Sequence, residues 1–371
     1  MVLVKRVENI EEFASLREAW KDLYESSGIF STFLTWEWLF TWWKHYGQEK
    51  ELYLLTAMDG NQVVGIAPLM RLEIHKRGFK IRKLCSIANQ DTDVSGFIFP
   101  CGGLDIMQQL CAYIIENQDQ WDILELSDVP RTCLDPTIFK DHFNSKDFHF
   151  LCKPTIHYNI QLNCNWDCYQ REISSHFKRN IRRRKKMLKE AGKNYSVTHV
   201  RGEEIQPQHI NRIFEIQTNS RHPCVYETQQ EKSFHTDLIA MTGEMGWPGI
   251  SIINLDEEPV AYEYGFIHHH RFEFWRSGFD TRFEQYTPGN ILLLEMIENF
   301  CSQGIQELDM LRGDEGYKKR WNSKEQSYHH LQIIKKKSFR CMVLYSWLPA
   351  LKQRLQNFTI QNNHDDNDRE D

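Results

Sequence analysis

A short stretch of the chain carries an unusual density of reactive side chains. It begins with a predicted strand over residues 305–311, which a polar loop follows. A carboxylate in such a place can accept a proton, a tyrosine can donate one, and an arginine binds a carboxylate or a phosphate through two parallel N–H groups. These types predict general acid–base chemistry on a polar substrate. The residues that would do it are Asp309, Arg312, Asp314, Glu315 and Tyr317.

The elements before this loop would place an anion site beside it. Residues 271–277 form a predicted strand, and a loop closing on Tyr286-Thr287-Pro288-Gly289-Asn290 opens a helix that runs to about Cys301. The first turn of a helix leaves backbone N–H groups unpaired at the positive end of the helix dipole, and proline suits the first helical position. This geometry fits an anionic ligand such as a pyrophosphate.

The order of residues across the whole stretch resembles the CelD/BcsL-type bacterial acyltransferases. These are relatives of the FemAB peptidyltransferases on the GNAT acetyltransferase fold. The resemblance implies an α/β (α+β) protein of two GNAT-like units, with mixed sheets flanked by helices, and acyl transfer from coenzyme A or another activated carrier. The pattern that carries it is Tyr286-x-Pro288-Gly289-x-x-Leu292-Leu293, then Gly304, then Asp309-x-Leu311-Arg312-Gly313-Asp314-Glu315-x-Tyr317-Lys318-x-x-Trp321.

Three residues are predicted to be catalytic. Asp309, at the carboxyl end of its strand, is the first candidate for the base or for the group that orients the acceptor; a loop-capping carboxylate is the alternative. Glu273 is the second candidate, and its face depends on the register of the hairpin through His268–His270. Tyr317 is a candidate for protonating the leaving thiolate, as is Tyr286, and lining the pocket is the alternative for both.

The expected co-substrate is acetyl-CoA or another acyl-CoA, and the helix start is expected to bind its phosphates. The residues predicted for this contact are Tyr286, Pro288, Gly289, Asn290 and Ile291.

Arg312 and Lys318 are predicted to hold a carboxylate or a phosphate of the substrate. The alternative is that they pair with Asp314 and Glu315 in a local ion network.

A strongly basic helix is predicted over residues 174–191. Phe177, Ile181 and Leu188 form a narrow apolar stripe, and lysines and arginines cover the remaining surface. Three interpretations remain open, namely a solvated helix face, contacts from Lys178 and Arg182 to the phosphates of a carrier or substrate, and RNA binding. The near absence of interleaved aromatic residues counts against RNA. A similar segment lies between the two halves of FemAB relatives.

Two similar hairpins indicate a duplicated unit. The first joins residues 51–56 to 63–69 around Asp59-Gly60, and the second joins residues 249–255 to 260–267 around an acidic turn. Only Cys101-Gly102-Gly103, without a Pro-Gly helix start, follows the first hairpin. We therefore expect the first half to form one wall of the acceptor cleft.

The chain is accordingly divided into four predicted parts. Residues 1–155 form the first GNAT-like half, and residues 156–200 form a connecting strand and the basic helix. Residues 201–337 form the second GNAT-like half with the acyl-donor site. Residues 338–371 form a C-terminal helix and a disordered acidic tail. The C-terminal helix is basic and aromatic, and either packs against the protein or makes a weak contact with a membrane surface.

Composition narrows the class of protein. The 371 residues carry a net charge of −6, which argues against a generally nucleic-acid-binding surface, and the ten cysteines form no CxxC pair. No metal is expected: Cys164, Cys168 and His157 lack a second ligand pair at zinc spacing, and the histidines at 268–270 sit in a tight turn that would not present all three to one metal. The start lacks a signal peptide pattern, and no apolar run approaches the ~20 residues of a membrane span. A cytoplasmic location is expected.

The favoured function is that of an enzyme, an N- or O-acyltransferase. It would move an acetyl or acyl group from coenzyme A to an amine or hydroxyl of a sugar, a peptide or a cell-envelope polysaccharide precursor. One alternative is a FemAB-like transferase that uses aminoacyl-tRNA. Another is a catalytically silent GNAT-like module that binds a carrier or RNA. The density of polar residues after Ile305 favours the enzyme.

Overall fold

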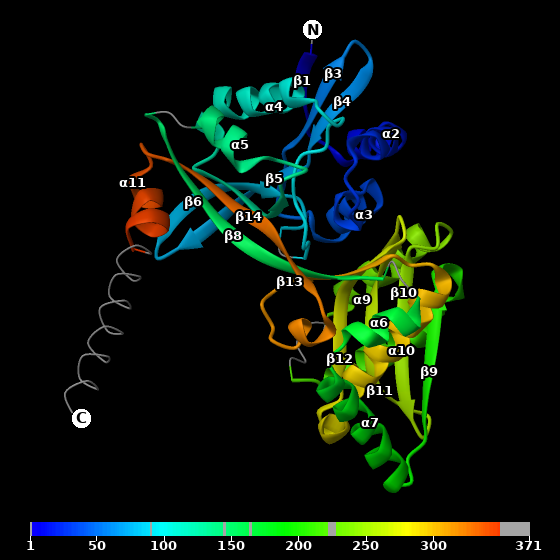
Figure 1. The fold of residues 1–371 in the computed structure, drawn as a ribbon. Coiled ribbons are helices and arrows are strands. Elements are labelled where there is room, and N and C mark those ends of the chain that lie inside the picture. Colours follow the sequence, from blue (N-terminus) through cyan, green and yellow to red (C-terminus); the bar gives the residue numbers. More distant parts are fainter. Residues whose placement is uncertain (1, 90, 144–145, 163–164, 222–227, 349–371) are drawn as a thin grey trace, which may run out of the picture.

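A computed structural model describes residues 2–89, 91–143, 146–162, 165–221 and 228–348. The chain folds into two halves that share one sheet and are covered by helices (Figure 1). The first half contains β1 (Val2–Val7), α1 (Ile10–Ser15), α2 (Arg17–Ser27), η1 (Thr32–Leu34), α3 (Trp36–Tyr46), β2 (Glu51–Leu52), β3 (Leu54–Asp59), β4 (Gln62–Ala67), β5 (Leu69–Lys76), β6 (Phe79–Ser86), α4 (Leu104–Glu116), η2 (Gln118–Gln120), β7 (Ile123–Pro130), α5 (Pro136–Phe143) and β8 (Phe148–Gln161).

The remaining part of the chain begins with two helices, builds the second half, and then returns to the first half with its last described strand and helical segments. Its elements are α6 (Trp166–Glu172), α7 (Ser175–Glu190), β9 (Tyr195–Arg201), η3 (Gly202–Glu204), α8 (Pro207–Thr218), α9 (Gln229–Gly243), β10 (Pro248–Leu255), β11 (Glu258–His268), β12 (Arg271–Phe279), η5 (Thr281–Tyr286), α10 (Pro288–Gln303), β13 (Glu307–Arg312), η6 (Lys318–Trp321), β14 (Lys324–Lys335), α11 (Phe339–Cys341) and η7 (Met342–Trp347).

The strands form a mixed sheet of eleven strands, in the order β2-β5-β6-β7-β14-β8-β13-β12-β11-β10-β9, and a second sheet, β1-β3-β4. The α/β fold with mixed sheets flanked by helices agrees with the prediction. Both predicted hairpins are present, as β3–β4 and as β10–β11.

The two halves are joined by the long strands β8 and β14, which cross between them in Figure 1. β14 pairs with β7 on one side and with β8 on the other, while the end of β8 also pairs with β13. The last strand of the chain is therefore built into the sheet of the first half. The predicted boundary at residue 155 falls inside β8, so the halves cannot part without breaking strand pairing.

The parallel pair β12–β13 positions the site. The two strands are paired only over Arg271–Glu273 and Glu307–Asp309. Beyond these residues the register of β12 against β11 shifts, and so does that of β13 against β8. Such bulges bend a strand and increase its twist. The two strands diverge as a fork, whose paired residues we call the root.

Side chains of helix α7 follow the predicted pattern. Phe177, Ile181 and Leu188 are buried in the core of the second half, and Ser174 caps the helix by accepting a hydrogen bond from the N–H of Phe177.

The C-terminal part predicted as residues 338–371 is described only to residue 348, as α11 and η7. Its continuation and the acidic tail Asn362–Asp371 lie outside the described residues. Within the described part of the chain, no helix has the length and apolar character to cross a membrane.

Candidate functional site

Two cavities of similar size open where the fork diverges. The turn cavity, about 680 Å³, lies beside the turn at residues 287–290. The interface cavity, about 690 Å³, lies between the two halves. Both are lined by Phe274, Ser277 and Tyr317. Because these side chains belong to both linings, the cavities adjoin at the divergence of β12 and β13.

The turn cavity contains the start of helix α10. Thr287 precedes the helix with φ 49° and ψ 55°, a left-handed conformation that is strained for a β-branched residue. Pro288 is the first helical residue, and Thr287, Pro288, Gly289 and Asn290 line the cavity. A Cβ built on Gly289 would meet no atom within 4 Å, so the space beside this backbone is open.

Two residues predicted for the carrier site lie elsewhere. Ile291 is fully buried in the core of the second half. Tyr286 packs against the same core and does not line the turn cavity. A helix turns by about 100° per residue, so consecutive residues of its first turn cannot all face one ligand.

The bulge in β12 brings backbone to the junction of the cavities. Opposite it on β11 lies Gly265, between the paired residues Tyr264 and Phe266. A Cβ on Gly265 would lie 2.0 Å from the carbonyl oxygen of Glu273, so only glycine fits there. The bulged residues Phe274 and Trp275 both line the interface cavity.

The root of the fork is a buried ionic cluster. Asp309 is fully buried, forms an ion pair with Arg271, and accepts a hydrogen bond of 2.8 Å from the N–H of Leu311. Glu273 is also buried and accepts a hydrogen bond of 2.7 Å from the N–H of Thr32. Burial raises the pKa of Glu273, and the nearby Arg271 offsets part of this shift.

Neither predicted base candidate lines the turn cavity or the interface cavity. Asp309 instead holds the bulge of β13, where Leu311 has φ 57° and Arg312 emerges into the interface cavity. This contact matches the capping alternative weighed from the sequence. Glu273 faces the first half, the side that the sequence could not decide.

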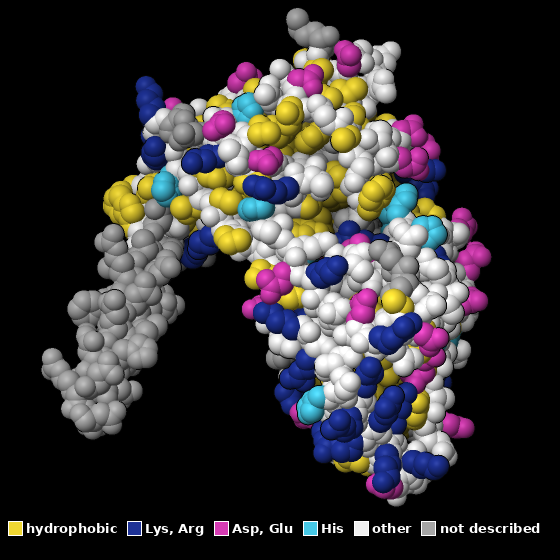
Figure 2. Space-filling model, in the orientation of Figure 1, with side chains coloured by type: hydrophobic (Ala, Val, Ile, Leu, Met, Phe, Trp, Pro, Cys, Tyr) yellow, Lys and Arg dark blue, Asp and Glu magenta, His cyan; other side chains and the backbone are white. Residues whose placement is uncertain are grey.

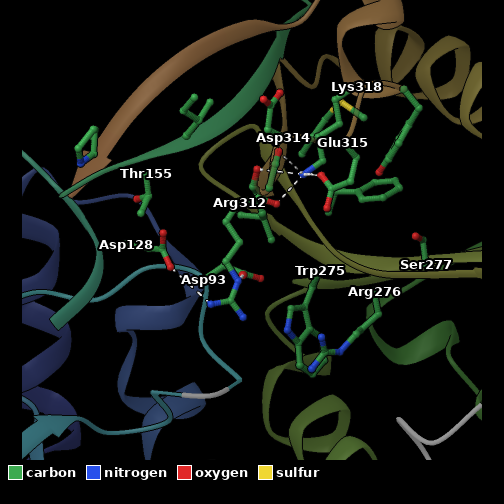
Figure 3. Close-up of a pocket in the computed structure, with 17 residues that line it drawn as sticks. Asp93, Asp128, Thr155, Trp275, Arg276, Ser277, Arg312, Asp314, Glu315 and Lys318 are labelled. Atoms are coloured by element: carbon green, nitrogen blue, oxygen red, sulfur yellow. Dashed lines mark hydrogen bonds and ion pairs between the residues drawn. The ribbon is translucent and has the colours of Figure 1, made fainter. Parts of the chain in front are cut away.

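The interface cavity brings together charged residues of both halves (Figure 3). Arg312 reaches from β13 to Asp93 (Nε to Oδ1, 2.6 Å) and to Asp128 (3.4 Å). Burial raises the pKa of Asp93, and the positive charge of Arg312 lowers it in part. Asp128 has φ 52° and lies 3.5 Å from the buried ring of His157.

Arg312 thus does form an ion network, but its partners are acids of the first half rather than Asp314 and Glu315. Lys318 is buried, and its ammonium donates to the carbonyl oxygen of Arg312 at 2.6 Å and pairs with Glu315 at 2.9 Å. These contacts stabilise the loop after β13 and pair the charge of Lys318 within the protein.

Tyr317 stands at the junction of the two cavities, as a proton donor would need to. Burial raises its pKa, and the nearby carboxyl of Glu263 adds to the shift. Glu263 lines the turn cavity from β11, and burial raises its pKa well above the usual value. Tyr317 therefore keeps its proton at neutral pH.

The predicted phosphate contacts of the basic helix lie outside both cavities. Lys178 donates to the carbonyl oxygen of Gln170 at 2.6 Å, whereas Arg182 is exposed. α7 is fastened beside the turn, because Arg184 donates to the carbonyl oxygen of Gln285 and Lys185 pairs with Glu295. In Figure 2 basic side chains gather on this lower part of the molecule.

Several lining residues were missed from the sequence. Asp93 and Asp128 follow the predicted strands at 83–87 and 122–126, a position where acids often serve a site in α/β sheets. Glu263 is a lone carboxylate in the apolar strand Val260–Ile267. A single acid in an apolar strand indicates a site residue, because burying an unpaired charge is costly. Of the residues considered as metal ligands, Cys164 lies outside the described residues, and among those described no group of three or more His, Cys, Asp or Glu could hold a metal ion.

The second half of the chain matches a known domain family. Residues 175–319 match the family model described as acetyltransferase (GNAT) domain, a stretch that begins at α7 and includes the fork. The second half of the chain therefore carries a GNAT domain, and the resemblance to this acyltransferase family is confirmed.

Solved structures show the same fold over nearly the whole chain. The crystal structure of FemX is similar with a TM-score of 0.59 at 10% identity, covering 89% of this chain and 96% of that one. A conserved protein of unknown function from Bacteroides thetaiotaomicron VPI-5482 has a TM-score of 0.51 at 12% identity, covering 90% and 100%. The DUF2156 domain of a putative lysylphosphatidylglycerol synthetase from Agrobacterium fabrum has a TM-score of 0.50 at 8% identity, covering 88% and 93%. No curated protein sequence matches significantly.

Proposed function

We propose that this protein is an acyltransferase that moves an acetyl or acyl group from coenzyme A to an amine or hydroxyl. The carrier would lie in the turn cavity and the acceptor in the interface cavity. The observation that supports this most strongly is the junction of the two cavities at Phe274, Ser277 and Tyr317. A thioester held on one side there can meet a nucleophile from the other.

The turn cavity fits the carrier's phosphates. The N-terminus of the sixteen-residue helix α10 opens into it, and the missing side chain of Gly289 leaves room for close approach to the backbone. Arg320 adds positive charge to the lining, where Arg221 is paired with Glu284. These features fit the acyl-CoA co-substrate that the GNAT family implies.

The interface cavity supplies a base that the root does not. The acceptor nitrogen or oxygen attacks the thioester carbonyl carbon, and Asp93 accepts its proton; a carboxyl of raised pKa is better suited to this than an ordinary one. The bond from carbon to sulfur then breaks, and Tyr317 donates its proton to the leaving sulfur. Backbone N–H at the bulge of Phe274 and Trp275 would stabilise the negative charge on the carbonyl oxygen.

The lining of the interface cavity suits a polar acceptor. Asp93, Asp314 and Glu315 offer carboxylates, and Arg276 and Arg312 offer guanidinium groups. This mixture of hydrogen-bond donors and acceptors matches an amino sugar, a peptide or an envelope-polymer precursor.

A thiol-release assay with acetyl-CoA and a panel of amines, amino sugars and peptides tests the proposal. Asp93→Asn and Tyr317→Phe should each lower kcat by about 10²–10⁴-fold while coenzyme A binding is kept. Tyr286→Phe is the matched control, since Tyr286 lines neither cavity. Full activity in both site variants would overturn these roles. Coenzyme A binding without any turnover would favour the silent carrier-binding module.

The exposed cations of α7 support one alternative, a transferase that uses aminoacyl-tRNA as the donor. Native mass spectrometry with acetyl-CoA and with aminoacyl-tRNA separates the two. Retention of coenzyme A alone supports the proposal, whereas a complex with charged tRNA alone would replace it.

A further inference from the structure

Exposed aromatic and basic side chains gather at the outer end of the first half, around α11 at the left of Figure 1. Phe339 is 67% exposed, Trp347 is 54% exposed and Phe79 is 44% exposed. The rings of Phe339 and Trp347 meet edge to face, with centroids 5.7 Å apart. Large apolar side chains so exposed are unusual when they lie together, and such a surface commonly marks a contact site.

The helical segment that carries two of these rings is firmly seated. Cys341 and Leu344 are buried against Ile81 and Ile334 of the sheet. Phe339 and Trp347 lie eight residues apart, about two helical turns, and share the opposite, exposed side. The protein thus buries one side of the segment and presents the aromatic side outward.

The turn between β5 and β6 adds the third ring to the same face. Phe79 pairs across the hairpin with Lys76, whose ammonium lies 4.1 Å from the ring centroid of Tyr345. Strand alternation points Phe79 to the same face as Ile81, on which the C-terminal segment packs. Two segments distant in sequence therefore build one surface.

Basic residues surround the three rings. Asp122 and Asp147 are the acids paired here, with Arg340 at 3.6 Å and Lys337 at 3.4 Å. Further lysine and arginine side chains are exposed beside them, so this surface is positive although the whole chain has a net charge of −6. We define the aromatic–basic tip as Phe79, Phe339 and Trp347 with Lys76, Arg77, Lys336, Lys337 and Arg340.

We propose that the aromatic–basic tip docks on the surface of an anionic lipid bilayer. Tryptophan and phenylalanine rings settle at the level of the lipid headgroups, and lysine and arginine are attracted to anionic lipids nearby. The tip provides both kinds of contact on one rigid surface. Charge complementarity identifies the occupant, since an exposed protein groove offers neither a continuous negative surface nor an apolar layer beneath it.

Flotation of the full chain with lipid vesicles tests the proposal. The protein should float with vesicles that mix phosphatidylcholine and phosphatidylglycerol, and stay behind with phosphatidylcholine alone. The double variant Phe339→Ala/Trp347→Ala should weaken binding by about tenfold or more, because two interfacial anchors are removed. Lys336→Glu/Lys337→Glu should weaken it by at least about fivefold for each charge reversed.

Two controls separate the tip from other surfaces. Leu3→Ala removes a side chain that is 58% exposed elsewhere, and should leave binding unchanged. Arg182→Ala/Arg183→Ala removes charge from α7 and should have little effect. Melting curves confirm that each variant is folded.

The proposal is overturned if wild type fails to float with anionic vesicles, or if only the α7 variant loses binding. It is also overturned if Phe339→Ala/Trp347→Ala dissociates a dimer in solution without changing vesicle binding, which would identify the tip as a contact between two copies.

Discussion

The parallel strand pairs of the two halves begin alike and are then used differently. In the first half, β6 and β7 pair over Lys83–Cys85 and Ile123–Glu125. In the second half, β12 and β13 pair in the same way at the root. In each pair, the first strand carries a cation, and the second strand carries an acid two residues beyond the residue that pairs with that cation. These form the ion pairs of Lys83 with Glu125 and of Arg271 with Asp309.

Beyond the paired residues, the strands of the second half diverge and leave the space between them open. In the first half, another segment of the chain occupies the corresponding space. After β6 ends at Ser86, Ile87 donates to the carbonyl oxygen of Pro68, and Ser95 donates to that of Asp128. The described residues of the segment 87–98, without residue 90, are thus bonded to Pro68 just before β5, to β7 at Ser95, and to β4 through the pair Ile98 and Ile66. The same segment carries Asp93 to the interface cavity.

The interface cavity lies where the corresponding ends of the two forks meet. Asp128 follows the root acid Glu125 by three residues, and Arg312 follows Asp309 by three. The two side chains contact each other at 3.4 Å. Each half thus contains a fork. The fork of the second half is open, and the filled fork of the first half supplies the acids Asp93 and Asp128 to it. Because the filled half keeps the root ion pair, this pair belongs to the architecture of the fork.

Removal of the root acids gives the largest expected effect. Asp309→Asn leaves Arg271 without its buried partner, and should lower the free energy of unfolding by about 3–5 kcal/mol. Glu125→Gln should also be destabilising, though by less, because Glu125 keeps 11% of its side chain exposed whereas Asp309 is fully buried. Denaturant unfolding of both variants measures this.

An activity assay on the same Asp309→Asn protein decides between architecture and chemistry. An architectural role should change kcat per folded molecule by less than about tenfold. The prediction from sequence, that Asp309 is the base, instead expects a loss of about 10²–10⁴-fold with stability almost unchanged. The latter result would show that the Arg271–Asp309 pair serves catalysis and is not equivalent to the Lys83–Glu125 pair.

Gly289→Val should weaken coenzyme A binding by about tenfold or more. The new side chain would enter the turn cavity rather than strike the protein, since no atom lies within 4 Å of a Cβ there. Titration calorimetry measures the change. Gly316→Val is the matched control, because its Cβ also meets open space and Gly316 lines neither cavity. Equal affinity in wild type and Gly289→Val would show that coenzyme A does not bind in the turn cavity.

Glu263→Gln should flatten the dependence of stability on pH. Burial raises the folded-state pKa of this carboxyl, so the folded protein holds its proton more tightly than the unfolded chain does. Its contribution to stability is present below its unfolded pKa, about 4.3, and is lost as pH rises toward the folded pKa. The melting temperature of wild type should therefore fall more than that of the variant between about pH 5 and pH 8. Parallel curves would contradict the raised pKa.

The smallest expected effect concerns the cations of α7. If they contact a polyanionic carrier or RNA, each charge removed by Arg179→Ala, Arg182→Ala or Arg183→Ala should lower the slope of log affinity against log salt by about 0.7–0.9. Lys178 and Lys185 already have partners within the protein, so their removal should affect stability more than the salt slope. If the triple variant keeps the wild-type slope of log affinity against log salt, these cations form a solvated helix face.

Local patterns predicted the parts of the fork, because they depend on neighbouring residues. Pro288 at the first helical position and Gly304 at its end bound helix α10 as its sequence indicates. Alternation around Asp59-Gly60 predicted the first hairpin correctly. The apolar stripe of α7 likewise identified its buried side. The helix cap, the turn and the amphipathic pattern are each set within about two helical turns of chain.

The role of Asp309 shows where such patterns end. Its sequence position beside Arg312 and Tyr317 is the same whether its carboxylate faces a substrate or Arg271. Pairing of β12 with β13 buries it, and the bulge then turns Arg312 outward. Glu273 depended on register in the same way, since one shift of pairing reverses the face of every side chain in a strand.

Local residue patterns indicated the Pro-Gly helix start and the polar residues that follow the strand at residues 305–311. Only the tertiary structure placed β14 inside the first half, filled one fork with residues 87–98, and brought Asp93 and Asp128 to Arg312. These contacts join residues about 180 to 220 positions apart in the chain. Their geometry follows from long-range strand pairing and packing, which no local spacing of residues encodes.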